Sequence, residues 1–288
     1  MSFVPILLGL TSALFLSCSD LLSRGASRVQ GPYATATHQL LVGTIVLAVV
    51  TAVFLPTVTL TPYAVALMVS AAVLNFGSLA LLYRGLHEGV VSVVAPIVYS
   101  SPSVTLVFSV LLLGVSITAT QVVALVGVIA GVLLVSTRFS ELRARPTVVG
   151  VRYAVVSAIL GGLAFLALGA AAPIVGPILP VFFMRAVGAL SGFAIAPVLG
   201  QKVRLTRYTF SPRVIAVALL AVTAFLAYTT AVNLEPNSLP IVAAVGGIGG
   251  AFEAVYAVVY LREKLEPNQI AGVVLLVACV AALLYLSG

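Results

Sequence analysis

The sequence contains little charge, no tryptophan and only two cysteines. Of its 288 residues, 7% are charged and 62% are hydrophobic, and the mean hydropathy is +1.26. A soluble domain carries about 25% charged residues, so this chain has too little polar surface for a water-facing globule. Cys18 and Cys279 stand alone in apolar runs, which excludes a disulfide framework and a cysteine metal cluster. The composition therefore predicts an integral membrane protein.

Motifs for catalysis and for nucleotide binding are also missing from the sequence. The glycine run at 246–250 has no preceding strand pattern and lacks the GxGxxG spacing, so we reject a nucleotide loop. No Walker loop, metal-ligand spacing or Ser-His-Asp pattern occurs. We expect no enzyme, no catalytic residue, no metal and no cofactor. Nucleic acid is not an expected partner either, because the basic loops offer no folded platform for bases.

The chain does contain ten long apolar runs. Runs of about 20 residues predict transmembrane helices, because a helix satisfies every backbone polar group internally. Pro96, Pro102 and Pro197 fall within such runs, where we expect kinked helices. The predicted fold class is an all-α polytopic membrane protein of ten transmembrane helices. Its spans are 3–22, 33–55, 62–83, 91–114, 118–137, 151–172, 177–200, 213–233, 239–261 and 267–286.

Lysine and arginine are distributed on one side of these spans. Thirteen of the 14 cations lie in the loops after odd-numbered spans or at their edges, and none lies on the opposite side. The positive-inside rule then predicts that these loops are cytoplasmic and that both termini are outside. The basic loops at 138–152 and 202–213 are expected to attract anionic lipid headgroups.

The two halves of the chain are related at a spacing of about 148 residues. Residues 111–121 align with 259–269, which matches Gln121 to Gln269. Each half has five predicted spans, and an odd number inverts the second copy in the membrane. We predict repeats at 1–145 and 146–288. Inverted repeats are typical of secondary transporters, whose sites lie near the membrane midplane.

Four stretches resemble a known family: ALLYRGLHEGVVSVVAPIVYSSPSVTLVFSVLLLG (80–114), GVIAGVLLVS (127–136), FFMRAVGAL (182–190) and YLREKLEPNQIAGVVLL (260–276). They resemble the drug/metabolite transporter (DMT) superfamily, EamA type, over essentially the whole chain. The resemblance implies alternating-access transport of a small metabolite, with export of amino acids or related compounds, in a prokaryotic plasma (inner) membrane. It leaves open whether the protein is a monomer or a homodimer. A structural or lipid-scrambling membrane protein is the alternative.

Two ionisable residues fall deep within predicted spans. Arg185 lies about eight residues into the seventh span, where an arginine costs at least about 2.5–3.5 kcal/mol on insertion scales. Its planar fork could hold a substrate carboxylate or phosphate. Glu253, in the ninth span, could bind and release a proton or neutralise a cationic substrate. The alternatives are an ion pair between the two, or an Arg185 side chain that reaches the membrane edge.

Weaker candidates complete the predicted central cavity. His38 is the counterpart of Arg185 at a spacing of 147 and is either a proton relay or a neutral histidine packed between helices. Asp20 lies four residues before Arg24, which favours a structural helix-end pair over a place in the cavity. The other predicted cavity residues are Asn75, Tyr83, Tyr99 and Tyr228. Three glycine pairs are predicted to pack helices closely: 127 with 131, 188 with 192, and 246 with 250.

Overall fold

The structure, a computed structural model, describes residues 3–54, 60–88, 97–98, 100–114, 118–137, 139–140, 150–249, 252, 256 and 265–287. These residues form ten α-helices and two 3₁₀ helices, and none of them is in a strand. The first half contains α1 (Phe3–Gln30), α2 (Pro32–Phe54), α3 (Pro62–Glu88), α5 (Ser101–Leu113) and α6 (Ala119–Ser136). The second half contains α8 (Val151–Val175), α9 (Ile178–Ile195), η1 (Arg207–Phe210), α10 (Pro212–Leu234), η2 (Pro236–Ser238), α11 (Leu239–Gly246) and α13 (Pro267–Ser287).

Six of these helices are long and apolar enough to cross a membrane. They are Phe3–Gln30, Tyr33–Phe54, Pro62–Leu82, Val151–Val175, Ile178–Ile195 and Pro212–Leu234. Three shorter helices are also apolar: Ser101–Leu113, Ala119–Val135 and Pro267–Ala282. Many large apolar side chains point outward from the bundle, among them Val123, Leu190 and Val274. A soluble monomer rarely exposes so much apolar surface, so the predicted all-α polytopic membrane fold is confirmed.

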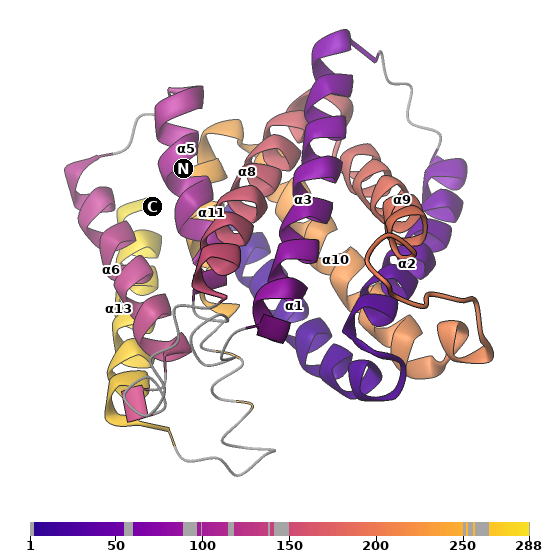
Figure 1. Ribbon diagram of the computed structural model, residues 1–288. Coiled ribbons are helices and arrows are strands. Elements are labelled where there is room, and N and C mark those ends of the chain that lie inside the picture. The colour runs from indigo at the N-terminus through magenta and orange to yellow at the C-terminus, as the bar shows by residue number, and fades with distance from the viewer. Residues whose placement is uncertain are drawn as a thin grey trace.

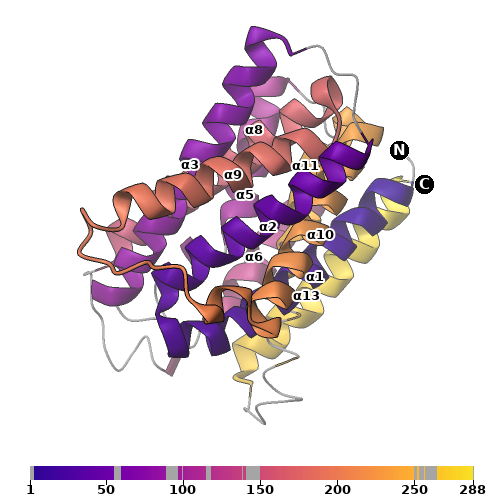
Figure 2. The same ribbon diagram turned by 90° about the vertical axis from the view of Figure 1, so that its right-hand side faces the viewer.

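The helices pair across the two halves of the chain. α1 packs along α10, α3 along α8, α2 along α9, and α6 along α13. Figure 1 shows α6 and α13 side by side at one edge of the bundle, with α2 and α9 at the opposite edge. Figure 2 views the α2–α9 edge from the front, with the two ends of the chain next to each other at one end of the bundle. Buried apolar side chains form two large clusters. One lies among α1, α5, α6, α11 and α13, and the other among α2, α3, α8, α9, α10 and α11.

Glycines bring the paired helices close together. A methyl group on Gly127 would clash with the Cys279 sulfur, and one on Gly131 would lie 2.7 Å from Leu276 Cγ. A methyl group on Gly192 would lie 2.6 Å from Thr37 Oγ1. The predicted packing role is confirmed for the pairs 127/131 and 188/192. A methyl group on Gly246 would have no neighbour within 4 Å, so the predicted packing role is wrong for Gly246. Its predicted partner, residue 250, lies outside the described residues.

Several predicted helix ends are wrong, and prolines account for two of them. Pro102 lies in the first turn of α5 rather than inside a helix, where the missing N–H of proline has no helical partner to lose. Pro197 follows the end of α9, so the seventh span ends earlier than expected. Pro96 lies outside the described residues. The first helix continues to Gln30, beyond the predicted end of the first span at residue 22.

Apart from Arg185, the described cations gather at one end of the bundle, opposite the chain termini. The guanidinium groups of Arg84 and Arg152 lie 5.0 and 4.7 Å from the ring centre of Tyr153, which joins the end of α3 to the start of α8. Likewise, Arg213 at the start of α10 lies beside Gly25 of α1. We name this the cationic end.

We predict that Gly131→Ala destabilises the protein. The added methyl group meets Leu276 Cγ at 2.7 Å and the Gly272 carbonyl oxygen at 3.1 Å, and such overpacking costs about 1–3 kcal/mol. Thermal unfolding in detergent should show a lower melting temperature. Gly246→Ala is the matched control, because its methyl group meets no atom within 4 Å. Equal melting temperatures for the two variants would contradict this packing.

Candidate functional site

Arg185 is buried at the middle of the helix bundle. Its side chain is 2% exposed, and the residue lies midway along α9. It faces Gly43, which lies midway along α2, and a methyl group on Gly43 would lie 3.4 Å from Arg185 Cδ. Since both helices are long enough to cross a membrane, this charge lies close to the membrane midplane.

The guanidinium group of Arg185 has donors without partners. Within the described residues, neither Nε nor Nη2 makes a hydrogen bond, and both atoms are buried. One face of the group is covered by the ring of Phe225 on α10, at 4.9 Å from the ring centre. A cation over an aromatic face is stabilised by about 0.5–2 kcal/mol. The contact compensates part of the charge, and the edge of the group has no partner among the described residues.

Phe225 belongs to an aromatic cluster that includes one predicted site residue. Its ring stacks on Phe165 of α8, with centroids 5.2 Å apart and planes at 17°. The ring of Tyr228 meets Phe165 edge-on at 5.2 Å, and the Tyr228 hydroxyl donates to the Phe165 carbonyl oxygen at 3.0 Å. The structure therefore brings Tyr228 and Arg185 into one cluster, in which the Tyr228 hydroxyl already has a partner.

Asp20 supplies negative charge to this region. It is half-buried on α1, and its carboxylate interacts favourably through space with the charge of Arg185. The side chain of Arg24, its expected partner, lies outside the described side chains. The interaction with Arg185 favours the alternative that Asp20 lies near the predicted cavity.

His38 lies nearer the cationic end than Arg185 does. It precedes Gly43 by five residues on α2, which is about 7.5 Å along a helix axis. The ring is 2% exposed; Nδ1 lies 2.9 Å from Gln30 Oε1 and Nε2 lies 3.5 Å from Thr209 Oγ1. These contacts tie α2 to the end of α1 and to η1, which favours the packed-histidine alternative over a role beside Arg185.

The remaining predicted residues are placed less completely. Asn75 is half-buried midway along α3, and it makes no hydrogen bond with a described residue. Tyr83 lies on α3, and its side chain is not among those described. Tyr99 and Glu253 lie outside the described residues. The predicted central cavity thus stays a prediction.

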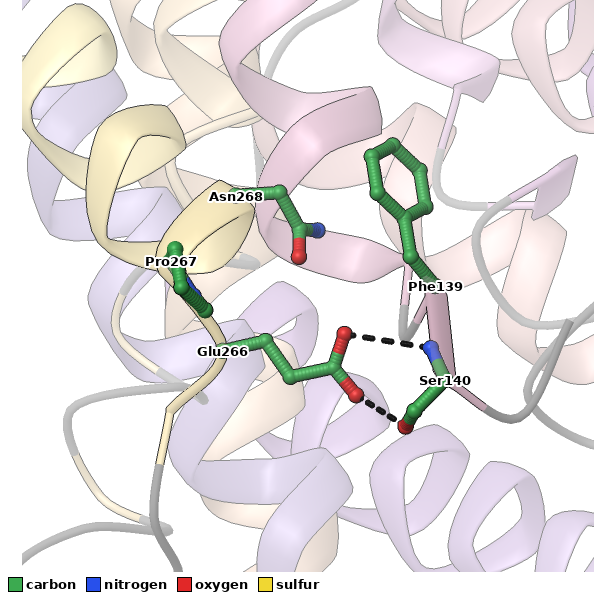
Figure 3. A pocket seen from close by; sticks show the side chains of 5 residues that line it. All are labelled: Phe139, Ser140, Glu266, Pro267 and Asn268. Carbon is green, nitrogen blue, oxygen red and sulfur yellow. Dashed lines mark hydrogen bonds between the residues drawn. The ribbon is translucent and has the colours of Figure 1, made fainter. Parts of the chain in front are cut away.

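A surface pocket of about 670 Å³ lies away from this cluster (Figure 3), lined by Phe139, Ser140, Glu266, Pro267 and Asn268. The Ser140 hydroxyl and backbone N–H both donate to the Glu266 carboxylate. Asn268 Nδ2 donates to the carbonyl oxygens of Leu134 and Thr137 at 3.0 and 2.7 Å. These bonds satisfy carbonyl groups that the end of a helix leaves unpaired, so the pocket is a joint between α6 and α13.

Sequence reasoning missed Gly43, Phe165 and Phe225. Each lies in an apolar run without a distinguishing spacing, so no signal separates it from lipid-facing or core residues. Their contribution depends on contacts between segments far apart in sequence, which only the packing of α2, α8 and α10 reveals.

Comparisons with known proteins agree with this fold. Residues 3–137 match the EamA-like transporter family. A protein of known crystal structure, 17% identical in sequence, superposes with a TM-score of 0.76 over 98% of this chain and 96% of that chain. At this identity the likeness shows the fold alone. No curated protein matches the chain by sequence at a significant level.

The fold is that of an all-α polytopic membrane protein, with a buried arginine midway along α9. The family match covers residues 3–137, slightly less than half of the chain, and is consistent with the drug/metabolite transporter superfamily, EamA type. The matched family consists of transporters, which supports a membrane transporter.

We predict that Phe225→Leu removes a stabilising contact of the Arg185 guanidinium group and lowers the stability of the protein. Removing the ring loses a cation–π contact of about 0.5–2 kcal/mol, so stability in detergent should fall, while Phe225→Tyr retains the ring and the contact. A double-mutant cycle with Arg185→Gln isolates the pairwise free energy. A coupling free energy of zero would show that the ring and the guanidinium do not interact.

Proposed function

We propose that the protein is a secondary transporter that moves a small metabolite by alternating access around Arg185. The observation that carries the proposal is the buried guanidinium group at mid-depth, whose Nε and Nη2 have no partner among the described residues. Ionisable residues within transmembrane helices are costly and mark substrate pathways. Amino acids or related compounds are the substrates, and export is the direction; both follow from the family resemblance.

The proposal includes two inverted repeats, 1–145 and 146–288, and the helix contacts support it. A shift of 148 residues carries α1, α2 and α3 onto α8, α9 and α10. The contact between α1 and α10 then corresponds to the contact between α8 and α3. The contact between α3 and α9 corresponds to the contact between α10 and α2. The α2–α9 and α6–α13 pairs map onto themselves. This pattern is expected of two halves related by a two-fold axis in the membrane plane.

The starts of the last helices of the two halves repeat one local structure. Gln121 Oε1 accepts from the Thr118 backbone N–H at 3.0 Å. At 148 residues further on, Gln269 Oε1 accepts from the Glu266 backbone N–H at 3.1 Å. The glutamine match therefore has a physical basis in helix capping.

Breaks in two helices also support a transport mechanism. Near the fourth span, Ser100 N–H donates to the Ile97 carbonyl oxygen, and in the ninth span Gly247 N–H donates to Ala244. Both bonds span three residues instead of four, and the positions correspond under the shift of about 148. A methyl group on Gly247 would lie 3.9 Å from Pro102 Cβ. Interrupted helices at matching positions in two repeats are a feature of transporter binding sites.

Proton coupling is assigned to Glu253, with His38 as the second candidate. A carboxylate in the ninth span can exchange a proton when its surroundings alternate between wet and dry. His38 is the weaker candidate because both ring nitrogens have neighbours within hydrogen-bonding reach. By the bias of Lys and Arg, the cationic end faces the cytoplasm and both termini lie outside.

We predict that the purified protein, reconstituted in lipid vesicles, moves labelled amino acids and that an imposed pH gradient accelerates the flux. Glu253→Gln should abolish the dependence on pH, because glutamine cannot exchange a proton, while His38→Gln should retain it. Flux measured with and without the gradient in each variant tests both assignments.

Normal flux in both Glu253→Gln and Arg185→Gln would remove these residues from the transport site. Vesicles that move no small solute but equilibrate labelled lipids between leaflets would favour a scramblase instead.

A further inference from the structure

We propose that Arg185 recognises its substrate by a monoanionic carboxylate, held side-on by Nε and Nη2, so that the substrate class is small carboxylic acids with or without an amino group. The inference rests on the transport function proposed above and deepens it. It names the chemical group that the central site selects.

The two donors without partners lie on the same edge of the guanidinium group. Nε–H and one N–H of Nη2 point in nearly parallel directions, a geometry that matches the two oxygens of one carboxylate. Both nitrogens are buried and lack a partner among the described residues. A buried charged donor without a partner is costly, and one bidentate anion would satisfy both at once.

The packing around Arg185 holds this edge in one orientation. Phe225 covers a face of the guanidinium group at 4.9 Å, and the side-chain stem passes beside Gly43. A methyl group on Gly43 would meet Val222 Cγ2 at 3.2 Å and Arg185 Cδ at 3.4 Å. The absence of a side chain at this position therefore gives the arginine its room.

The charge balance favours one negative charge on the ligand over two. Arg185 contributes one positive charge, and Asp20 already acts on it with a negative charge. A phosphate monoester carries close to two negative charges at neutral pH, and in a low-dielectric site the second charge would be repelled. A carboxylate adds one charge and has the planar shape of the arginine edge.

A matched set of ligands on one carbon skeleton tests the inference. For leucine the set comprises leucine, 4-methyl-2-oxopentanoate, leucinamide, 3-methylbutylamine and 3-methylbutyl phosphate, and the corresponding sets for phenylalanine and serine widen the range of sizes. Binding is measured on the purified full-length protein as thermal stabilisation in Tris-chloride buffer. Flux of the same compounds is measured in lipid vesicles.

We expect the two acids of at least one set to stabilise the protein, while the amide, the amine and the phosphate do not. Arg185→Gln should weaken acid binding about 10- to 100-fold, the range for hydrogen bonds to charged groups. Arg185→Lys should give an intermediate loss, because it keeps the charge without the fork. Arg213→Gln, the same change at an exposed arginine of the cationic end, should bind as the wild type does.

Gly43→Ala provides a second variant if Arg185→Gln fails to fold. Its methyl group must displace Arg185 Cδ or Val222, so acid binding should fall. Gly188→Ala is the control, because it lies on the same helix interface but faces Leu40, and it should have a smaller effect.

The inference is wrong if the amines or amides bind as tightly as the acids, if the phosphates bind in place of the acids, or if no acid binds. It is also wrong if acid binding survives Arg185→Gln unchanged. Flux measurements distinguish failure of this inference from failure of the proposed function. If amines cross the vesicle membrane, the protein is a transporter that recognises its substrate by another group. Vesicles that pass none of the compounds remove the transport proposal as well.

Discussion

A guanidinium charge held midway across a membrane is the constraint on which the rest of the site depends. Arg185 cannot reach water as a surface arginine does, and transferring it into hydrocarbon costs several kcal/mol, at least about 2.5–3.5 on insertion scales. The protein compensates in three ways that the structure describes. The ring of Phe225 covers one face, the carboxylate of Asp20 contributes opposite charge, and Gly43 gives space. The edge formed by Nε and Nη2 has no partner among the described residues, and a ligand can bind there.

Close helix packing makes this arrangement possible. α2 and α9 approach each other through Gly188 and Gly192, which face Leu40 and Thr37. The same interface places Gly43 against the stem of Arg185. Dispersion contacts, rather than a hydrophobic effect, hold helices together in lipid. A helix pair built on small residues is therefore both a structural joint and the wall of the proposed site.

Helix positions were predictable from sequence because apolar run length and bilayer thickness agree. The run at 151–172 corresponds to α8 and that at 267–286 to α13. Helix ends were less predictable, since Pro102 and Pro197 act through local backbone geometry that hydropathy does not register. Arg185 stood out as a lone cation in a span, and its burial is confirmed.

The neighbours of Arg185 could not be inferred in the same way. Phe165 and Phe225 are 60 residues apart in sequence and stack only because α8 and α10 pack together. His38 aligns with Arg185 by repeat spacing, yet its ring is held by Gln30 and Thr209 at the cationic end. Spacing relates two backbone positions, whereas the partners of a side chain depend on which helices meet there.

A structure of the protein in lipid with a bound carboxylic acid would test the recognition mechanism most directly. Both carboxylate oxygens should lie at about 2.7–2.9 Å from Nε and Nη2 of Arg185, the spacing of charge-assisted hydrogen bonds. A protein carboxylate, such as that of Glu253, on this edge with the ligand bound elsewhere would contradict it.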